Sequence, residues 1–347
     1  MSVTIKEVAR RAGVSISTVS RVMAGEARVR PENRRKVESI VKEMDYSPNS
    51  TAQSLVSHAA NAIGLLLTEA EAERANHPFG MELIRGAVTR ANRSGFDLFI
   101  GSGSGERAGQ QVMSRLVRGK RVDGAIVLAG RHKEAVIDWM RTNGAPFVLI
   151  GRSEQEGVPS VDIDNEAAGY EAAYHLIRLG HKRIGFVGLA TERDAVECRF
   201  RGYKRALRDN GLSWRSGWIL EEELLRDGGD RAMAYLTSLL QRPTALVAAD
   251  DMTALSVIRA LHNLELRVPA DMAVVGFDNT PLAELSVPPL SSIDTGAYHL
   301  GYWAADRLLR MLRQKKNGAE GPERLVVPHK LVVRESSMPV RGPISPA

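Results

Sequence analysis

The 347-residue sequence predicts an α/β protein with two lobes, each a parallel sheet flanked by helices, and a small all-helical domain at its N-terminus. Short apolar segments of strand length alternate with amphipathic helices from residue 62 onward. The alternation occurs in two series of similar size, which indicates two lobes instead of one large sheet. Residues 1–60 lack this alternation and show only the helical spacing of their apolar residues.

Each predicted strand is a short and mostly apolar run, as expected for a strand buried on both faces of a parallel sheet. The strands of the first series are Ala62–Leu67, Phe96–Gly101, Val122–Leu128 and Phe147–Ile150, and those of the second are Arg183–Val187, Ala245–Ala249 and Ala273–Phe277. The predicted helices are Met81–Ser94, Gly109–Arg118, Lys133–Thr142, Glu166–Leu179, Phe200–Asn210, Asp230–Leu240 and Met252–Leu264. Because open parallel sheets bind ligands beyond the carboxyl ends of their strands, we expect a ligand between the lobes.

Residues 4–23, TIKEVARRAGVSISTVSRVM, predict two short helices around a tight turn. Thr4 is placed to cap the first helix, and Glu7, three residues later, completes a capping box. Gly13 ends that helix where a left-handed backbone is needed, and Ser15 caps the next one. The pattern predicts a helix-turn-helix unit, in which the start of the second helix contacts base edges in the DNA major groove.

The second helix keeps Val19 and Val22 for its inner face, so that its start and outer face can contact DNA. We predict DNA contacts from this unit by Thr4, Ser15, Ile16, Ser17, Thr18, Ser20 and Arg21. A third helix begins at Pro31, and Arg28 before it is a candidate phosphate contact. Residues 1–60 contain ten Lys and Arg against six Asp and Glu, a net charge of +4, which suits a DNA-binding end. The alternative is a helical appendage with a solvated charged face.

The segment YSPNSTAQSLVS, residues 46–57, predicts a short helix that is only marginally stable. Pro48 interrupts the preceding helix, and Asn49 or Ser50 caps a new one of about eight residues, whereas isolated helices below roughly 12–15 residues are marginal in water. Leu55 is an apolar residue in a polar helix, and apolar wedges inserted from the minor groove kink DNA. We therefore predict DNA contacts by Asn49, Ala52, Gln53 and Leu55.

The run from Thr4 to Leu67 resembles the lactose-repressor (LacI/GalR) family of bacterial transcription regulators. The resembling pieces are TIKEVARRAGVS, TVSRVM, VRPENRRKV, YSPN, AQSL and AIGLLL. The resemblance implies that Leu55 is a minor-groove lever, that Arg21 reads bases, and that the positions of Ile16 and Ser17 vary with operator preference. It covers essentially the whole chain through SVDIDNEAAGYEAAYHLIRLGHKRIGFVG and LRVPADMAVVGFDNTPLAELSVPPLSSID. The lobes are then of the periplasmic-binding-protein type.

The same resemblance implies three crossings between the lobes, so that each lobe is discontinuous in sequence. The expected domains are a helix-turn-helix domain at 1–47, a hinge helix and linker at 48–61, an N-terminal lobe of the effector-binding core at 62–161 with 292–326, a C-terminal lobe at 162–291 with 327–340, and a disordered tail at 341–347. We expect the tail to be disordered because its proline-rich composition cannot form a core.

The resemblance also implies an effector-binding cleft. It places Arg199 at the family's ligand-binding arginine, Asp278 at its carboxylate position and Phe79 where an aromatic residue often lines the cleft, and Arg193 is a weaker match. An arginine fork and a carboxylate suit vicinal hydroxyls, because one donates and the other accepts hydrogen bonds. The alternatives are a structural ion pair between Arg199 and Asp278, and core packing for Phe79.

Three residues depart from the family pattern in this cleft. Gly151 stands where several members have an aspartate, Ala249 where an asparagine is often found, and Leu224 where some members have a stacking aromatic residue. We expect Arg152, beside Gly151, to compensate by binding a hydroxyl or an acidic group. Three effector classes fit: a sugar, a sugar acid and a phosphorylated sugar.

The sequence contains no convincing catalytic, cofactor or metal motif. The glycine-rich residues 101–105 lack the last glycine of a dinucleotide fingerprint, and the eight histidines show no metal-ligand spacing. Cys198 has no second cysteine to pair with, as expected in a reducing cytoplasm. The apolar runs are too short to span a bilayer, and no targeting signal precedes the first helix. We expect a cytoplasmic bacterial protein that is not an enzyme and has no cofactor, metal or membrane partner.

These expectations combine into a homodimeric repressor of a carbohydrate-catabolism operon. Two helix-turn-helix units read the halves of a pseudo-palindromic operator on double-stranded DNA, and two hinge helices meet over the minor groove, each inserting Leu55. A sugar-like effector closes the cleft, separates and melts the hinge helices, and releases the DNA. No leucine-heptad helix that would build a tetramer is present. The alternatives are a cytoplasmic sugar-binding receptor and a sugar-acting enzyme with an accessory helical domain.

Overall fold

The computed structural model describes residues 3–23, 28–46, 59–67, 78–103, 108–128, 130, 133–190, 194–225, 228–314 and 324–338. The chain divides into two compact units, Met1–Asn61 and Ala62–Ala347. The predicted DNA contacts Asn49, Ala52, Gln53 and Leu55, the predicted effector contact Arg193 and the tail 341–347 lie outside the described residues.

The first unit contains the three helices that the sequence predicts, α1 (Ile5–Ala12), α2 (Ile16–Met23) and α3 (Pro31–Glu43). Their inner faces form a small buried core of Val8, Ala9, Ala12, Val19, Val22 and Val37. Gly13 ends α1 with a φ of +67°, and Pro31 lies in the first turn of α3. The turn and the third helix therefore form for the reasons that the sequence indicates.

The start of α1 differs from the prediction. Thr4 is the N-cap residue, but its side chain makes no capping hydrogen bond. Its backbone carbonyl accepts hydrogen bonds from the amides of Glu7 and Val8, at 3.0 and 3.1 Å. The Glu7 carboxylate lies 3.7 Å from the Arg10 guanidinium, on the next turn of the helix. The predicted capping box is not formed, because Glu7 pairs along the helix and does not reach back to Thr4.

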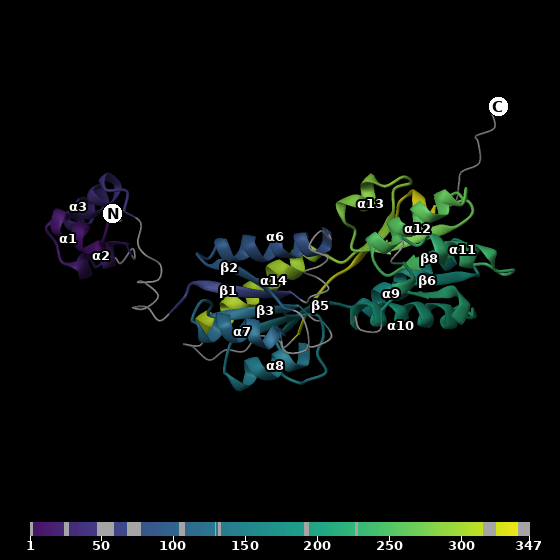
Figure 1. Cartoon of the computed structure of the whole chain (residues 1–347), viewed down its shortest axis with the longest axis horizontal. Helices are drawn as coiled ribbons and strands as arrows, with labels where there is room; N and C mark the ends of the chain where they lie inside the picture. Colours follow the sequence, from purple (N-terminus) through teal and green to yellow (C-terminus); the bar gives the residue numbers. More distant parts are fainter. Residues whose placement is uncertain are drawn as a thin grey trace, which may run out of the picture. The chain divides into compact units, whose positions relative to one another are not determined.

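The second unit is built on two sheets of six described strands each (Figure 1). The first sheet contains β1 (Ala62–Leu67), β2 (Asp97–Ser102), β3 (Gly124–Leu128), β4 (Phe147–Ile150), β5 (Ser160–Ile163) and β11 (Arg324–Val327). The second contains β6 (Ile184–Leu189), β7 (Ile219–Glu221), β8 (Ala245–Ala248), β9 (Ala273–Phe277), β10 (Ser291–Asp294) and β12 (Lys330–Val332). Their orders are β11-β5-β4-β3-β1-β2 and β12-β10-β9-β8-β6-β7. Among these pairs, β12 alone is antiparallel to its neighbour.

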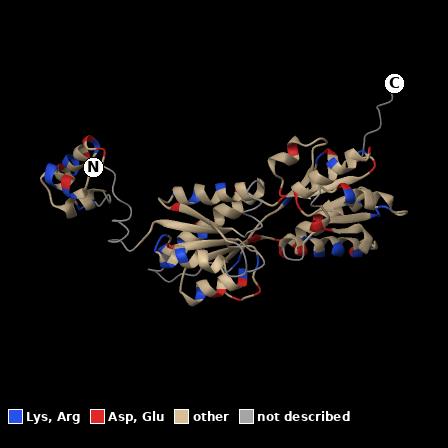
Figure 2. Cartoon of the chain, in the orientation of Figure 1, with Lys and Arg blue, Asp and Glu red and all other residues tan. Residues whose placement is uncertain are grey.

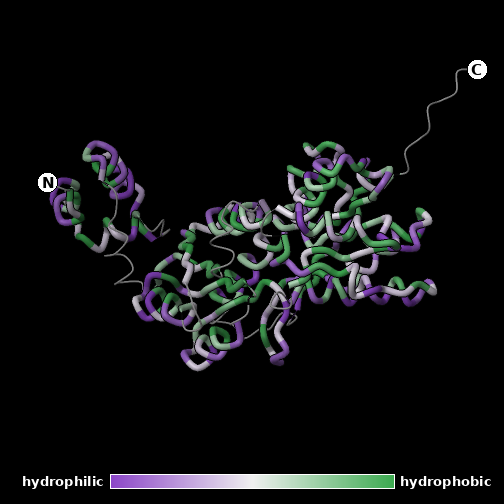
Figure 3. Tube along the Cα trace, turned by 45° about the vertical axis from the view of Figure 1, so that its right-hand side comes forward, coloured by the Kyte–Doolittle hydropathy of each residue, from purple (hydrophilic) through white to green (hydrophobic). Residues whose placement is uncertain are grey.

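Helices cover both faces of each sheet (Figure 1). On the first sheet, α6 (Pro78–Asn92) and α14 (Ala297–Gln314) lie on one face, and α7 (Ala108–Arg118) and α8 (Lys133–Thr142) on the other. On the second sheet the corresponding helices are α9 (Asn165–Arg178) with α10 (Asp194–Asp209), and α11 (Asp230–Ser238) with α12 (Asp251–Asn263). The connections contain α13 (Pro281–Leu285), η1 (Ser216–Trp218), η2 (Glu222–Leu225) and η3 (Glu335–Ser337). Figure 3 shows the hydrophobic residues gathered along the strands inside these helical layers.

The chain passes between the two sheets three times. It leaves the first sheet after Ile163, returns to it after Asp294, and leaves it again after Val327. The expected boundaries were 161, 291 and 326, so the chain leaves each sheet two, three and one residues later than expected. The reason is that β5, β10 and β11 continue to pair with neighbouring strands up to Ile163, Asp294 and Val327.

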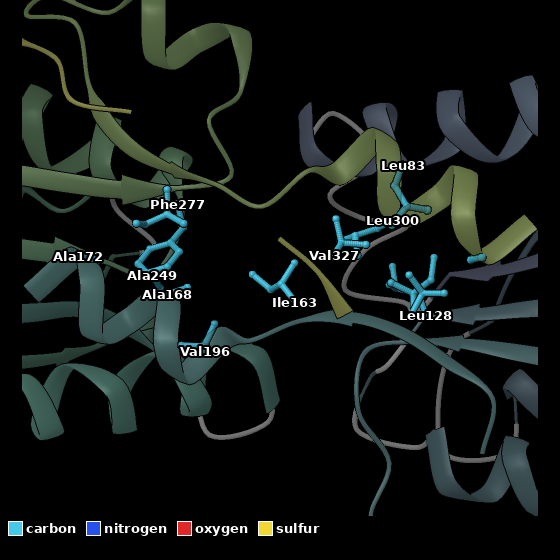
Figure 4. Close-up of a cluster of buried hydrophobic side chains, with 14 of the residues drawn as sticks. Leu83, Leu128, Ile163, Ala168, Ala172, Val196, Ala249, Phe277, Leu300 and Val327 are labelled. Carbon is cyan, nitrogen blue, oxygen red and sulfur yellow. The ribbon is translucent and has the colours of Figure 1, made fainter. Parts of the chain in front are cut away.

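One buried core continues from the first sheet to the second. Figure 4 shows Ile163 between two groups of apolar side chains. Phe277 and Ala249 lie on the side of the second sheet, and Leu300 and Val327 on the side of the first. The segments that join the sheets are therefore packed, and they hold the ends of their strands close to one another.

Two helices of the second sheet pack closely through a glycine on each. A Cβ at Gly169 of α9 would lie 2.0 Å from the carbonyl oxygen of Arg199, and a Cβ at Gly202 of α10 would lie 1.9 Å from that of Glu166. Helices α6 and α14 of the first sheet pack in the same way. Backbone thus meets backbone at both contacts, and no flexible side chain is present that could move aside.

We expect Gly202→Ala to destabilise the protein, because the added methyl group pushes two helix backbones apart. Overpacking of this kind costs about 1–3 kcal/mol, which urea unfolding followed by circular dichroism would measure. Gly80→Ala is the matched control, since no atom lies within 4 Å of a Cβ there. The control is expected to be neutral or to stabilise α6 by roughly 0.5–1 kcal/mol. Equal changes in the two variants would contradict the close-packing argument.

Candidate DNA-binding and effector-binding sites

Ser15 organises the start of α2, the predicted DNA-reading helix. Its hydroxyl accepts a hydrogen bond from the Thr18 amide at 3.2 Å, which is the predicted N-cap. The same oxygen lies 2.8 Å from the hydroxyl oxygens of Ser17 and Thr18. The first turn of α2 therefore presents three linked hydroxyl groups, each able to donate or accept a hydrogen bond.

The outer face of α2 carries the predicted contact residues. Val19 and Val22 are buried in the core, whereas Ile16, the first residue of the helix, is 45% exposed. Ser17, Ser20 and Arg21 are also exposed, and Thr18 is half-buried. The other two predicted contacts of the first unit that the structure describes, Thr4 and Arg28, are exposed as well. A branched apolar side chain, hydroxyl groups and a guanidinium on one exposed helix start suit base-edge contacts.

Several carboxylates of the first unit are engaged in ion pairs with its own cations. Lys36 donates a hydrogen bond to Glu32 at 2.8 Å, and this contact lowers the pKa of the Glu32 carboxyl group. Arg11 pairs with Glu43 at 3.0 Å and joins α1 to α3. Because cations outnumber carboxylates in this part of the chain, the unit keeps a positive surplus (Figure 2).

The Arg199 guanidinium lies at the centre of the polar groups in the second unit. It is buried, and its Nε donates to the Asn165 side-chain oxygen at 3.0 Å. Its Nη1 donates to the Ala249 carbonyl oxygen at 2.7 Å, and its Nη2 lies 3.5 Å from Asp278 Oδ1. The guanidinium also stands 4.5 Å above the Phe277 ring centroid. Arg199 thus ties α10 to the start of α9 and to the ends of β8 and β9.

Asp278 follows β9 in an unusual conformation. Its φ is +97°, in the left-handed region that non-glycine residues rarely adopt. Its amide donates to the Ile293 carbonyl oxygen at 2.8 Å, and its carboxylate accepts from the Thr295 hydroxyl at 3.3 Å. Backbone strain of about 1–3 kcal/mol persists where the surroundings fix the residue, often at binding sites. The structure therefore brings Arg199 and Asp278 together, in a geometry that fits both the predicted ligand pair and the alternative ion pair.

The remaining predicted effector residues are placed separately. Phe79 in α6 is partly buried and packs against the apolar core, as its core-packing alternative describes. Arg152, beyond the end of β4, is exposed and lines a cavity of about 240 Å³ with Asp162 and Arg324 among others. Leu224 is 55% exposed, so the position where some relatives have an aromatic residue faces solvent.

Sequence reasoning did not single out Asp162, although it lies in the quoted motif SVDIDN. Its Oδ1 accepts hydrogen bonds from the Ile163 amide at 2.8 Å and from the Asn165 side chain at 3.2 Å. Its Oδ2 lies 3.5 Å from the guanidinium of Arg324 in the neighbouring strand β11. Burial raises the pKa of Asp162, and the nearby arginines partly oppose that shift. The sequence signal that could have identified this residue is a carboxylate between two apolar residues, Val161 and Ile163.

The contacts above form a continuous polar chain where the polypeptide crosses between the sheets. The crossing chain, as we name it, is Arg324–Asp162–Asn165–Arg199–Asp278. It joins β11 and β5 of the first sheet to α9, α10 and the end of β9 on the second. A displacement of either sheet relative to the other therefore changes a hydrogen bond or an ion pair.

Asp251 is a second buried carboxylate that the sequence did not indicate. Its Oδ1 accepts from the Ser292 hydroxyl at 2.6 Å, and its Oδ2 accepts from the amide and hydroxyl of Thr280 at 2.7 and 2.9 Å. Burial, together with the negative charge of Asp278, raises the pKa of Asp251 to about 7, and the three hydrogen bonds oppose the shift. Asp251 thus links the start of α12 to β10 and to the loop after Asp278.

The described part of the chain offers neither a metal site nor a membrane-spanning helix. Within it, no group of three or more His, Cys, Asp and Glu side chains is placed to hold a metal ion. No helix of the same residues is long and apolar enough to cross a membrane.

A helix-turn-helix unit joined to two sheets of the periplasmic-binding-protein type defines a ligand-responsive, DNA-binding transcriptional regulator. Residues 4–49 match the model of the lacI family of bacterial regulatory proteins, and residues 173–337 match that of the periplasmic binding protein-like domain. Catabolite control protein A of Priestia megaterium is 32% identical over 340 residues, which cover 97% of this chain and 100% of that protein. The chain belongs to the lacI family of bacterial transcriptional regulators.

Two solved structures extend this similarity to the fold. The complex of the transcriptional regulator CelR with cellobiose has a TM-score of 0.73 and 30% identity, covering 96% of this chain and 99% of that one. The lac repressor dimer bound to operator and the anti-inducer ONPF has a TM-score of 0.83 and 27% identity, covering 98% of this chain and 100% of that one. The predicted α/β fold class, with an N-terminal helix-turn-helix unit and a core of two sheets, is confirmed.

We expect Asp251→Asn to change how stability depends on pH. Between about pH 4 and pH 7 the folded protein holds a proton on Asp251 that the unfolded chain has lost, so stability falls as pH rises through this window and levels off above the folded pKa. Asparagine cannot ionise, and its oxygen can still accept from Thr280 while its amide donates to Ser292. The fall in unfolding free energy from pH 5 to pH 8 should shrink by about 1–3 kcal/mol in the variant.

Urea titrations at the two pH values measure this difference. The half-buried histidines His175 and His181, whose pKa values are lowered by partial burial, contribute equally to both proteins and cancel in the comparison. Asp138→Asn, at an exposed carboxylate, is the control and should retain the wild-type dependence. An unchanged pH dependence in Asp251→Asn would show that this carboxylate is ionised throughout.

Proposed function

We propose that this regulator is a homodimeric repressor of a carbohydrate-catabolism operon, acting on double-stranded DNA in the bacterial cytoplasm and released by a sugar-like effector. The observation that carries the proposal is the buried Arg199–Asp278 pair inside the crossing chain of a lacI-family protein. This pair supplies hydrogen-bond donors and an acceptor where the two sheets join. A ligand that bridges the pair therefore changes the hydrogen bonds and ion pairs that link the two sheets.

The DNA-reading role belongs to the start and outer face of α2. Ser15, Ile16, Ser17, Thr18, Ser20 and Arg21 contact bases or phosphates in the major groove, and Thr4 and Arg28 contact phosphates. The exposed Ile16 and the linked hydroxyl groups beside it support this assignment. In the linker 48–61, Asn49, Ala52, Gln53 and Leu55 contact the minor groove, and Leu55 is the inserted wedge. The proposed domains are those expected from the sequence, with the lobe boundaries moved to Ile163, Asp294 and Val327, where the chain passes between the sheets.

The effector-binding role rests on Arg199 and Asp278, with Phe79, Arg152 and Arg193 as further contacts. The Arg199 fork and the Asp278 carboxylate match vicinal hydroxyl groups. The complex of the similar regulator CelR with cellobiose supports a sugar as the effector class. The 3.5 Å contact between Arg199 and Asp278 is the longest of the three Arg199 contacts given above, so a ligand hydroxyl that inserts between the two groups can hydrogen-bond to both of them.

The homodimer is supported by apolar residues on the first sheet. Phe99 and Ile100 of the edge strand β2 are 42% and 51% exposed. An exposed apolar edge strand is a liability unless a partner covers it. A second copy that covers this edge gives the protein twofold symmetry, and the operator is then pseudo-palindromic.

We expect Arg21→Ala to weaken operator binding by about 10-fold to 100-fold, the loss typical of one bidentate base contact. The operator is first selected from random duplexes by the wild-type protein, and affinities are then measured by fluorescence anisotropy. The fold should be unaffected, because Arg21 lies on the exposed face of α2. Arg93→Ala, at an exposed arginine of the second unit, should change affinity less than threefold, roughly the value of one screened surface charge. Equal losses in the two variants would contradict base reading by α2.

We expect Asp278→Asn to weaken effector-driven release of the operator by about tenfold or more, because an amide replaces a charged acceptor for ligand hydroxyls. Cellobiose, gluconate and glucose 6-phosphate serve as probes, one for each effector class. The concentration that releases half of the DNA is measured for each, and Asp209→Asn, at an exposed carboxylate, is the control. If none of the three releases the operator from the wild-type protein, or if Asp278→Asn responds like the control, the effector assignment is wrong.

A further inference from the structure

The outward face of α10 carries a row of four cations beside a cavity. Arg201, Lys204, Arg205 and Arg208 follow the i, i+3, i+4, i+7 spacing of one helix face. All four line a cavity of about 620 Å³, whose remaining walls are Glu166, Leu212, Ser213 and Trp214. Figure 2 shows the blue residues along this helix. We call this feature the α10 groove.

Trp214 is the aromatic residue in the wall of the α10 groove, and the rings of Phe200 and Tyr170 lie near the groove's cations. Trp214 is 46% exposed and stands edge-on to Phe200, with the ring centroids 6.2 Å apart. The Lys204 amine lies 4.6 Å from the Phe200 centroid and 5.8 Å from that of Trp214. The Arg205 guanidinium lies 4.9 Å from the Tyr170 centroid. The groove therefore offers a partly exposed indole directly beside positive charge.

The cations of the α10 groove exceed its carboxylates. Glu166 pairs with Arg205 at 2.7 Å and lies 3.9 Å from Arg201. Arg208 lies 3.2 Å from Asp209 and Arg201 lies 3.5 Å from Glu197, and both of these carboxylates are outside the cavity. No ion pair among the described residues gives Lys204 a carboxylate, and only the two aromatic rings accompany its amine. Exposed ion pairs are worth little, so these cations can turn toward a stronger anion at small cost.

A smaller cavity of mixed charge adjoins the α10 groove beside the crossing chain. It shares Glu166, Arg201 and Arg205 with the groove, and it adds two cations, Arg152 and Arg324, and two carboxylates, Asp162 and Asp164. Arg199 lies on the same helix but is buried, and it lines neither cavity. The α10 groove is thus distinct from the Arg199–Asp278 pair.

We propose that the α10 groove binds a nucleoside polyphosphate, with the base stacked on Trp214 and the phosphates held by Lys204, Arg208 and the neighbouring arginines. Lys and Arg side chains bind phosphate through charge-assisted hydrogen bonds. Aromatic side chains stack on any base, because every base has a π-face. The cavity volume lies within the range of small-molecule sites. A purely apolar ligand would leave four cations desolvated, and an inorganic anion would leave the exposed indole uncovered.

The test measures binding of ATP, tripolyphosphate and adenosine to the full-length protein by isothermal titration calorimetry, without DNA and at low salt. ATP should bind at least about fivefold more tightly than tripolyphosphate, since stacking adds to the phosphate contacts, and adenosine should not bind detectably. Lys204→Glu should weaken ATP binding about tenfold or more, because it reverses one charge. Trp214→Leu should remove the advantage of ATP over tripolyphosphate. Lys182→Glu reverses an exposed charge outside both cavities and should leave ATP affinity unchanged.

Four results would overturn the proposal: no ATP binding to the wild-type protein, equal affinity for tripolyphosphate and ATP, an ATP affinity that Lys204→Glu does not change, or loss of ATP binding in Asp278→Asn. The last result would place ATP at the Arg199–Asp278 pair. Operator affinity and its response to the three sugar probes are measured on the same samples, so failure of the repressor proposal would be seen separately.

Discussion

The buried guanidinium of Arg199 is the interaction on which the second unit depends. A charge removed from water is tolerated only when it is paired and its donors are hydrogen-bonded. The partners of Arg199 come from three different segments: the side chain of Asn165, the carbonyl of Ala249 and the carboxylate of Asp278. These segments must therefore meet at one point, and that point is where the strands of the second sheet end. Through Asn165 the constraint reaches Asp162 and the first sheet.

The same helix supplies both the constraint and the close packing that makes it possible. Gly202 lies three residues after Arg199 and lets α10 approach α9 until backbone meets backbone. On α9, Gly169 leaves room for the Arg199 carbonyl itself. This contact fixes the rotation of α10 against α9, so that the Arg199 side chain points inward. The cations of the α10 groove then lie on the solvent side of the helix. One helix thus carries a buried polar centre on one face and the α10 groove on the other.

The sequence indicated the apolar strands better than those that contain polar residues. Phe147–Ile150 and Ala273–Phe277 form strands with the predicted bounds, because both are apolar runs in which every residue is buried. Strands β5 and β10 are as short as Phe147–Ile150, but they were missed because each contains serine and aspartate. Arg199 and Asp278 could be selected through the family resemblance, whereas Asp162 and Asp251 could not. A carboxylate becomes a buried acceptor only through partners that are distant in sequence, and no local pattern reports them.

The distribution of charge differs between the crossing chain and the α10 groove. Along the crossing chain, cations and carboxylates alternate: Arg324 faces Asp162, and Arg199 faces Asp278. A ligand that enters there meets charges that already compensate one another, so a neutral polyhydroxyl compound gains hydrogen bonds without adding an unpaired charge. A phosphorylated ligand would bring negative charge beside Asp278 and Asp162, and the repulsion would offset part of its attraction to Arg199. In the α10 groove the cations are in surplus and solvated, which is the environment that favours phosphate. The two proposed sites therefore favour ligands of different charge, and among the three proposed effector classes the charges of the crossing chain favour an uncharged sugar.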